Sequence, residues 1–229
     1  MLNSTSSQMP AILNMLTPAS LQAHWPGLLG RLKNQVMLLT QAHTPLGYML
    51  VREIIQYSIH PVITVPEQKL IAGWWKEIFA CDPHSSCMEE NAARPESILN
   101  RLLWKYGQLN AVWLHTEKPE TDALIPFWKN WVQALSGVLK SNSLLIFSAA
   151  LETDKPALSK QWLSAANQEL NKLLRWLKKT LHPAIRIIVI PPLLYQCPSP
   201  VCTDIHEVVL LTDADIERNN FHPALLQMG

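Results

Sequence analysis

The chain has 229 residues, of which 48% are hydrophobic and 16% are charged, and its formal net charge at pH 7 is +1. This length and composition are typical of one globular domain and exclude a disordered chain. The near-neutral charge gives no electrostatic reason to expect binding to nucleic acid or to an anionic membrane. No run approaches the roughly 18 apolar residues that cross a bilayer, and the first residues lack the basic start of a secretory signal. We therefore expect a cytoplasmic protein without a membrane span.

Residues 1–30 differ from the rest of the chain, because they are polar at first and are then interrupted by prolines. We expect them to form an extension outside the main fold, and we place the domain itself at residues 31–229. An extension of this kind is suited to docking onto a partner protein, as segments that fold on binding do.

From Gln35 onward, short apolar runs alternate with longer segments of helical spacing. The apolar runs predict strands at residues 35–40, 61–65, 109–115, 143–149, 184–190 and 223–228. The i, i+3, i+4 spacing predicts helices at residues 46–58, 67–80, 95–107, 120–140, 155–181 and 203–213. This alternation predicts a doubly wound α/β domain, in which a mostly parallel sheet carries helices on both faces.

The four cysteines fall in two pairs, Cys81 with Cys87 and Cys197 with Cys202. A zinc site of four thiolates, helped by His84, is one interpretation of these pairs. Structural zinc sites usually have two residues between paired cysteines, whereas the gaps here are five and four residues. The spacing therefore favours free thiols, and we predict no metal site.

From residue 31 to the end, the order of the elements resembles that of the short-chain dehydrogenase/reductase family. Residues 35–65 resemble the family's first strand, glycine turn, first helix and second strand, and residues 94–115 the segment that ends in its fourth strand. Residues 143–194 resemble the fifth strand, the long central helix and the sixth strand, and residues 204–229 the closing helix and last strand. The resemblance implies a Rossmann-like fold, which in active relatives binds NAD(P) and transfers hydride.

The family's glycine turn, TGxxxGxG, falls on residues 40–47, and only its last glycine, Gly47, is present. Gln41 stands at the first glycine position and adds bulk where the turn must be tight. Pro45 stands at the second position and removes an N–H group from the loop that faces the phosphates. Since the whole chain holds only seven glycines, we predict that no dinucleotide is bound.

The other family positions also lack their usual residues. The acidic residue that holds the cofactor ribose in the family falls near Val65 and Pro66, with Glu67 close by. The family's aspartate near the adenine falls on Asn91. The family's NNAG motif falls on residues 114–117, which read Leu-His-Thr-Glu.

The catalytic tyrosine position is Pro156, the serine position is Ala149 beside Ser148, and the asparagine falls near Ala123, while Lys160 alone matches the lysine. Proline has no proton to donate, so the resemblance implies a pseudoenzyme. The segment 195–202 is also too short for the lid that shields active relatives from water.

Several single residues invite a catalytic interpretation that we do not favour. Without its tyrosine, Lys160 is best interpreted as a solvated helix lysine. His43 and His115 follow predicted strands, where ligands bind in such sheets, but we interpret both as loop histidines. Ser148, His115 and Asp154 suggest a hydrolytic triad, yet no G-x-S-x-G turn supports it.

Tryptophan is abundant, with nine residues in the chain. Seven lie on predicted helices, namely Trp74, Trp75, Trp104, Trp128, Trp131, Trp162 and Trp176. They either pack helices onto the sheet or anchor a partner protein, because aromatic residues are enriched at interfaces. In the family, helices 120–140 and 156–181 pair across the subunit interface, so we name as candidate interface residues Trp128, Trp131, Trp162 and Trp176.

These observations predict a non-catalytic scaffold or adaptor subunit of a larger protein assembly, with no catalytic, cofactor-binding or metal-binding residues. The whole chain also resembles accessory subunits of the Dot/Icm type IV secretion coupling complex, which implies a role in effector recruitment at the cytoplasmic face of the inner membrane. One alternative is an active NAD(P)-dependent oxidoreductase that uses His115 or Tyr195 as its acid. Another is a small-molecule sensor that keeps a modified pocket without turnover.

Overall fold

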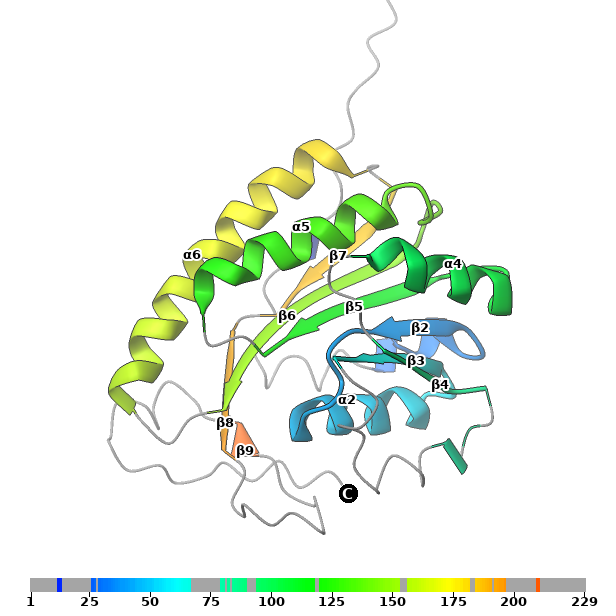
Figure 1. The fold of residues 1–229 in the computed structure, drawn as a ribbon, viewed down its shortest axis with the longest axis horizontal. Helices are drawn as coiled ribbons and strands as arrows, with labels where there is room; N and C mark the ends of the chain where they lie inside the picture. The colour runs from blue at the N-terminus through cyan, green and yellow to red at the C-terminus, as the bar shows by residue number, and fades with distance from the viewer. Residues whose placement is uncertain are drawn as a thin grey trace, which may run out of the picture.

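A computed structural model describes residues 12–13, 26–27, 29–66, 79–80, 82, 84–89, 94–117, 120–152, 156–181, 184–190, 192–196 and 209–210 (Figure 1). Its strands are β1 (Ile12–Leu13), β2 (Val36–Leu39), β3 (His60–Val65), β4 (Ser86–Glu89), β5 (Ala111–Thr116), β6 (Leu144–Glu152), β7 (Arg186–Val189), β8 (Leu193–Gln196) and β9 (Val209–Leu210). Its helices are η1 (Gly30–Leu32), α2 (Pro45–Gln56), α4 (Pro95–Tyr106), η3 (Thr121–Ala123), α5 (Leu124–Leu135) and α6 (Pro156–Thr180).

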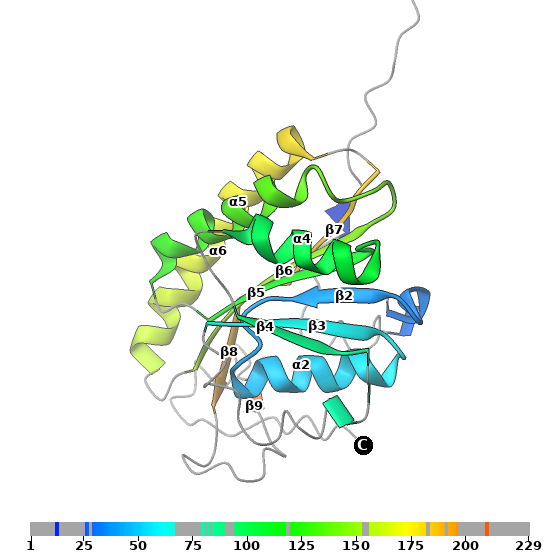
Figure 2. The same ribbon diagram turned by 45° about the vertical axis from the view of Figure 1, so that its right-hand side comes forward.

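The sheet runs in the order β1-β7-β6-β5-β2-β3-β4, and every neighbouring pair in this order is parallel. Strand β6 extends beyond β7, and its last residues pair in parallel with β8. Among the strands that the structure describes, β9 alone runs antiparallel, against β8. Helices α4, α5 and α6 cover one face of the sheet, and α2 lies on the opposite face (Figures 1 and 2). The predicted doubly wound α/β fold is thus confirmed.

Two clusters of buried side chains hold the helices to the sheet, one on each face. The strands β2, β5 and β6 are mostly apolar, as expected of strands whose two faces are both covered. Alternate residues of β2 illustrate this, since Leu38 packs in the cluster under α4 and α5, whereas Met37 and Leu39 pack in the cluster under α2. This rigid sheet fixes the residues that follow each strand at its carboxyl end.

The elements differ from the sequence expectations mainly at the margins of the sheet. Strand β4 was not predicted, because Ser86 and Glu89 interrupt its apolar pattern and a short edge strand is buried on one side only. The predicted linker 195–202 contains the end of β8, and the predicted helix 203–213 is wrong at Val209–Leu210, which form β9. The predicted helix 120–140 is a 3₁₀ turn followed by α5, which ends at Leu135. The expected helix 67–80, apart from residues 79–80, and the expected strand 223–228 lie outside the described residues.

Part of the predicted N-terminal extension contacts the domain. Ile12 and Leu13 pair in parallel with Ile187 and Ile188 of β7, so β1 occupies that edge of the sheet. Leu29 is also fully buried in the cluster under α2. The boundary at residue 30 and the docking role of residues 1–30 stay predictions. Among the helices described, none is long and apolar enough to cross a membrane.

Candidate functional site

The order of the strands places a topological switch point at the carboxyl ends of β2 and β5, which is the position of the ligand crevice in folds of this type. The chain leaves β2 toward β3 on one side, while β5 lies on the other side of β2. In open α/β sheets, ligands bind at such a switch point, outside the carboxyl ends of the strands. Here the crevice is formed by residues 40–44, which follow β2, and by residues 115–117 at the end of β5.

The turn after β2 keeps one of the family's backbone requirements. A Cβ atom on Gly47 would lie only 2.7 Å from the Cα atom of Ala42, so no larger residue fits there without a shift of backbone. Gln41 has a φ of 51°, a left-handed conformation that favours glycine. The turn after β2 therefore requires a glycine at residue 47 and holds Gln41 in a conformation that favours glycine.

Three backbone N–H groups of this turn are bonded within the protein. The N–H groups of Gln41 and Ala42 donate to Thr64, at 3.2 Å to its hydroxyl oxygen and 2.9 Å to its carbonyl oxygen. Pro45 has no N–H group, and the Gly47 N–H donates at 3.0 Å to the Thr44 hydroxyl, which caps α2. A bound phosphate needs such groups pointing at it.

Side-chain hydrogen bonds cross the crevice between the ends of β2 and β5. The Thr40 hydroxyl donates to the His115 carbonyl oxygen at 2.7 Å. The Gln41 amide oxygen accepts from the Thr116 hydroxyl at 2.9 Å and from the Glu117 N–H at 3.4 Å. The Thr44 hydroxyl is bonded to Glu117 Oε1. Four bonds thus join the carboxyl ends of β2 and β5, the position where dinucleotides bind in this type of fold.

A second polar chain continues from Glu117 into the sheet. The Trp113 indole N–H donates to the Ser148 hydroxyl oxygen at 2.7 Å, and that oxygen lies 2.9 Å from His115 Nδ1. His115 Nε2 lies 3.0 Å from Glu117 Oε1. Because a carboxylate only accepts, these partners assign the proton of a neutral His115 to Nε2, with Nδ1 accepting from Ser148.

This chain brings together two members of the disfavoured hydrolytic triad, with Glu117 in place of Asp154, which lies outside the described residues. Ser148 and His115 are nevertheless both fully buried, so a substrate has no access to the Ser148 hydroxyl. Its oxygen is moreover already an acceptor for an indole N–H. The arrangement is that of a satisfied structural network, in which each buried polar atom has a partner.

His43 lies beside this network and is less well satisfied. Its Nδ1 atom is buried without a hydrogen-bond partner. Burial lowers the pKa of His43, and the nearby His115 acts in the same direction, while the charge of Glu117 opposes them. His43 is therefore held neutral near the start of α2.

The other positions compared with the family in the sequence are described only in part. Ala149 is fully buried on β6, and Pro156 is the first residue of α6. Lys160 lies on α6 and is exposed, as the sequence led us to expect. The side chain of Tyr195 and residues Glu67 and Asn91 fall outside the described part of the chain.

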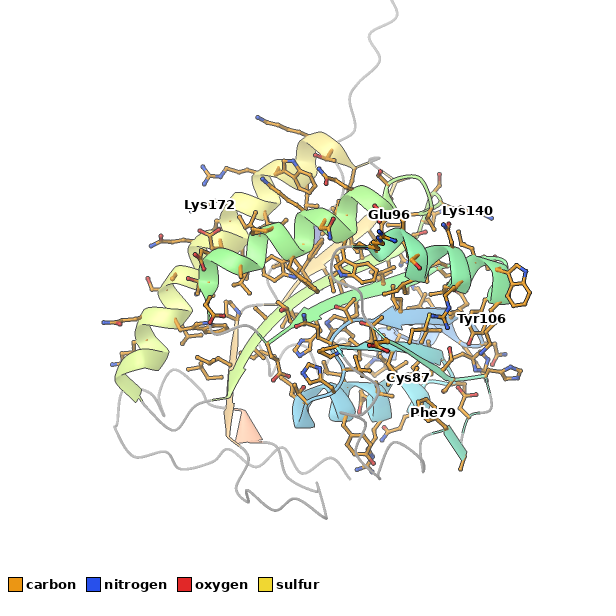
Figure 3. All side chains as sticks on the ribbon, in the orientation of Figure 1. Phe79, Cys87, Glu96, Tyr106, Lys140 and Lys172 are labelled. Atoms are coloured by element: carbon orange, nitrogen blue, oxygen red, sulfur yellow. The ribbon has the colours of Figure 1, made fainter. Side chains whose placement is uncertain are left out.

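The candidate interface tryptophans are mostly inside the domain. Trp128 and Trp131 are almost fully buried and Trp162 is 6% exposed, because α5 and α6 pack them onto the sheet. Their prediction as exposed partner anchors is therefore wrong. Trp176 is partly buried against the same cluster, under the ammonium group of Lys129. The described side chains at exposed positions of α6 are polar, and one of them, Lys172 (Figure 3), donates to the Glu169 carboxylate on the same helix.

Trp104 on α4 is the exposed large hydrophobic residue of the described segments, with 90% of its surface accessible. It belongs to the seven helical tryptophans but was not among the candidate interface residues. Its signal in the sequence is its position in α4, since Ile98, Leu99 and Leu102 form the buried face and residue 104 falls on the opposite one.

A polar cluster at the amino end of β3 was missed by sequence analysis. Both carboxylate oxygens of Asp82 lie 3.2 Å from His60 Nδ1, and Asp82 accepts from the His84 N–H at 3.0 Å and from the Ser85 hydroxyl at 2.7 Å. Burial alone would raise the pKa of Asp82, but the hydrogen bonds from Ser85, His84 and His60 outweigh it, so the pKa is lowered. The cluster joins segments 22 residues apart, which no local pattern reveals.

The described residues contain no group of three or more His, Cys, Asp or Glu side chains that could hold a metal ion. Cys87 is half-buried on β4 (Figure 3), and burial raises the pKa of its thiol to about 11. The other three cysteines lie outside the described residues, so the zinc question stays open for them.

Comparison with known proteins supports the fold. No protein-family model and no curated protein sequence matches the chain. A short-chain dehydrogenase/reductase from Brucella melitensis superposes with a TM-score of 0.54 at 14% identity, covering 70% of this chain and 76% of that one. An NAD+-bound xylitol dehydrogenase gives 0.58 at 9% identity, covering 74% and 73%. A short-chain dehydrogenase from Burkholderia cenocepacia in complex with NADP gives 0.53 at 14% identity, covering 69% and 74%.

The fold is that of a short-chain dehydrogenase/reductase. At identities this low the likeness concerns the fold alone, and activity has to be argued from the residues of the site.

Proposed function

We propose that this protein is a non-catalytic subunit that uses a short-chain dehydrogenase/reductase fold as a scaffold or adaptor in a larger protein assembly. The single observation that carries the proposal is the crevice at the switch point, which four hydrogen bonds cross between residues 40–44 and 115–117. A domain whose own side chains fill the cofactor crevice is suited to binding other proteins rather than to hydride transfer.

The catalytic positions support the same proposal. Ala149 and Pro156 offer no proton where the family has a serine and a tyrosine, and without the tyrosine Lys160 has no acid whose pKa it could lower. The alternative acid, His115, is fully buried and both of its nitrogens are already engaged. The residues of the site thus give little support to the oxidoreductase alternative, which rests on the likeness of the fold to dehydrogenases.

Thermal unfolding of the full chain with NADH or NADPH tests this part of the proposal. A ligand present at 100 times its dissociation constant adds about 2.7 kcal/mol, which raises the melting temperature of a domain of this size by roughly 5–11 °C. We expect no shift with either cofactor. A saturable shift at micromolar cofactor would contradict the proposal and favour the oxidoreductase. A small molecule that co-purifies and is identified by mass spectrometry would instead favour a sensor.

We propose Trp104 as a partner contact, in place of the buried tryptophans. An indole that is 90% exposed leaves a large apolar surface in water, and Arg101 and Lys105 are exposed beside it on α4. Tryptophan and arginine are over-represented among residues that dominate binding. Affinity purification of the tagged protein from its own cells should recover a partner, and Trp104→Ala should lose it. Gln168→Ala, at an exposed position of α6, is the control, and equal recovery by all three proteins would exclude this contact.

The assembly proposed from the resemblance of the whole chain is a Dot/Icm type IV secretion coupling complex, in which the protein would be a DotY-type accessory subunit for effector recruitment. This proposal places the protein at the cytoplasmic face of the inner membrane through its partners. The same affinity purification tests it, because coupling-complex subunits should be recovered with the full chain. Recovery should fall when residues 1–30 are deleted if those residues dock, and a partner set without secretion components would refute this assignment.

A further inference from the structure

The start of α2 needs a negative charge, and the helix itself does not supply one. The N-terminal end of a helix carries a partial positive charge of about 0.5, and anions are stabilised there. Helix α2 has no acidic residue in its first turn. In dinucleotide-binding folds of this type, the diphosphate of the cofactor lies at this helix end.

Glu117 brings a carboxylate to this position from the other side of the crevice. Its Oε1 atom accepts from the hydroxyl of Thr44, the cap residue of α2, and lies 3.0 Å from His115 Nε2. Only 9% of the Glu117 side chain is exposed. A carboxylate so far removed from water requires bonded partners of this kind. Its position at residue 117 is where the family's NNAG motif ends in a glycine, so relatives have no side chain there.

We propose that the Glu117 carboxylate is a built-in anion, which takes at the start of α2 the place that a dinucleotide diphosphate takes in active relatives. This inference rests on the proposed function, because it states how a non-catalytic chain keeps the turn after β2 in shape without a cofactor. Gln41 completes the replacement, since its amide oxygen receives the Glu117 N–H and the Thr116 hydroxyl. A second anion at this helix end would be repelled by Glu117.

The decisive variant is Glu117→Ala, which removes the resident carboxylate and leaves the start of α2 without an anion. Charge-assisted hydrogen bonds of this kind stabilise enough for the melting temperature to fall by about 5–10 °C. Potassium acetate should then raise the melting temperature of the variant in a saturable manner, when compared with potassium chloride at equal ionic strength. For a dissociation constant of about 20 mM, 100 mM acetate restores about 3 °C. Inorganic phosphate should act in the same direction.

Two controls separate this effect from general salt effects. The wild-type protein should show no acetate-specific rise, because its own carboxylate is in place. Glu169→Ala removes another paired carboxylate, bonded to Lys172 on α6, and should also show none. If acetate and chloride act alike on Glu117→Ala, or if acetate stabilises all three proteins equally, the proposal is overturned.

A variant of unchanged size covers the case in which Glu117→Ala does not fold. Glu117→Gln keeps the volume and an acceptor oxygen and removes only the charge, so its melting temperature should fall by about 2–4 °C. Glu169→Gln should remain near the wild type. A Glu117→Gln protein as stable as the wild type would refute the role of the charge. Because the cofactor titration of the wild type is independent of these variants, failure here leaves the proposed function standing, whereas cofactor binding by the wild type would refute the proposed function itself.

Discussion

Gln41 offers the sharpest test of how the crevice is held closed. Replacing it with glycine has two opposed effects on the free energy of unfolding. The φ of 51° is strained for glutamine, so Gln41→Gly gains about 1–2 kcal/mol from relief of that strain. It also restores the family's first glycine, so the family pattern by itself predicts a stabilised protein.

The hydrogen bonds predict the opposite result. Thr116 is fully buried, and in Gln41→Gly its hydroxyl loses the acceptor at 2.9 Å, which costs about 1–3 kcal/mol. Glycine also makes the unfolded chain more flexible, at a cost of about 0.4–1 kcal/mol. The net expectation is a loss of about 1 kcal/mol, or a fall of about 2–4 °C in melting temperature.

Urea unfolding of the variant measures this loss, and Asn142→Gly is the matched control. Asn142 also has a left-handed φ, of 71°, but it is exposed and lies outside the crevice, so its replacement should change stability by no more than about 0.5 kcal/mol. A double-mutant cycle with Thr116→Val should give a coupling energy of about 1 kcal/mol. A Gln41→Gly protein at least as stable as the wild type, or a coupling energy of zero, would refute the argument that Gln41 holds the crevice closed.

Three further predictions concern titratable groups. Because the pKa of folded His43 is lowered, the unfolded chain binds a proton at this residue before the folded protein does as pH falls below about 6.5. The free energy of unfolding should therefore fall in this pH range. In His43→Asn, the urea midpoint should change less between pH 7.5 and pH 5.5 than it does in the wild type. If the urea midpoint of His43→Asn falls as steeply as that of the wild type, another titratable group causes the pH dependence. Asp82→Asn should lose about 1–3 kcal/mol at pH 7, and because the pKa of Asp82 is lowered, this difference should shrink as pH falls below about 3.9; equal stability at pH 7 would contradict the cluster. At pH 8, a Cys87 thiol with a pKa of about 11 is ionised in about one molecule in a thousand. Peptide mapping after treatment with iodoacetamide should therefore find Cys87 modified far more slowly in the folded than in the unfolded protein. Equal rates of modification would show that the thiol is exposed.

The centre of the fold was predictable because its signals are local. The runs that form β2, β3, β5, β6 and β7 are mostly apolar, as expected of strands covered on both faces, and Pro95 and Pro156 mark helix starts. The edges were not predictable for the opposite reason. Strands β1 and β9 are two residues long, and such short pairings depend on a neighbouring strand rather than on their own pattern.

For the candidate site, the sequence predicts only which residues of the family's pattern are replaced. The sequence shows that Gln41 and Pro45 replace glycines, but their replacement does not reveal what fills the space. The contacts of Gln41 with Thr116 and Glu117 join residues 75 and 76 positions apart, so they depend on the register of β2 against β5. A glutamate where the family's NNAG motif ends in glycine was the one available signal, and it has meaning only when placed opposite the start of α2.

The large sequence separation of these crevice bonds also has a kinetic consequence. Closing a loop of about 75 residues is entropically costly, and in this chain it requires β2 and β5 to be already side by side. The crevice should therefore be among the last regions to assemble and the first to open. The amide proton of Glu117, which donates to Gln41, would then exchange with deuterated solvent much faster than the amides in the middle of β5, even in the intact domain.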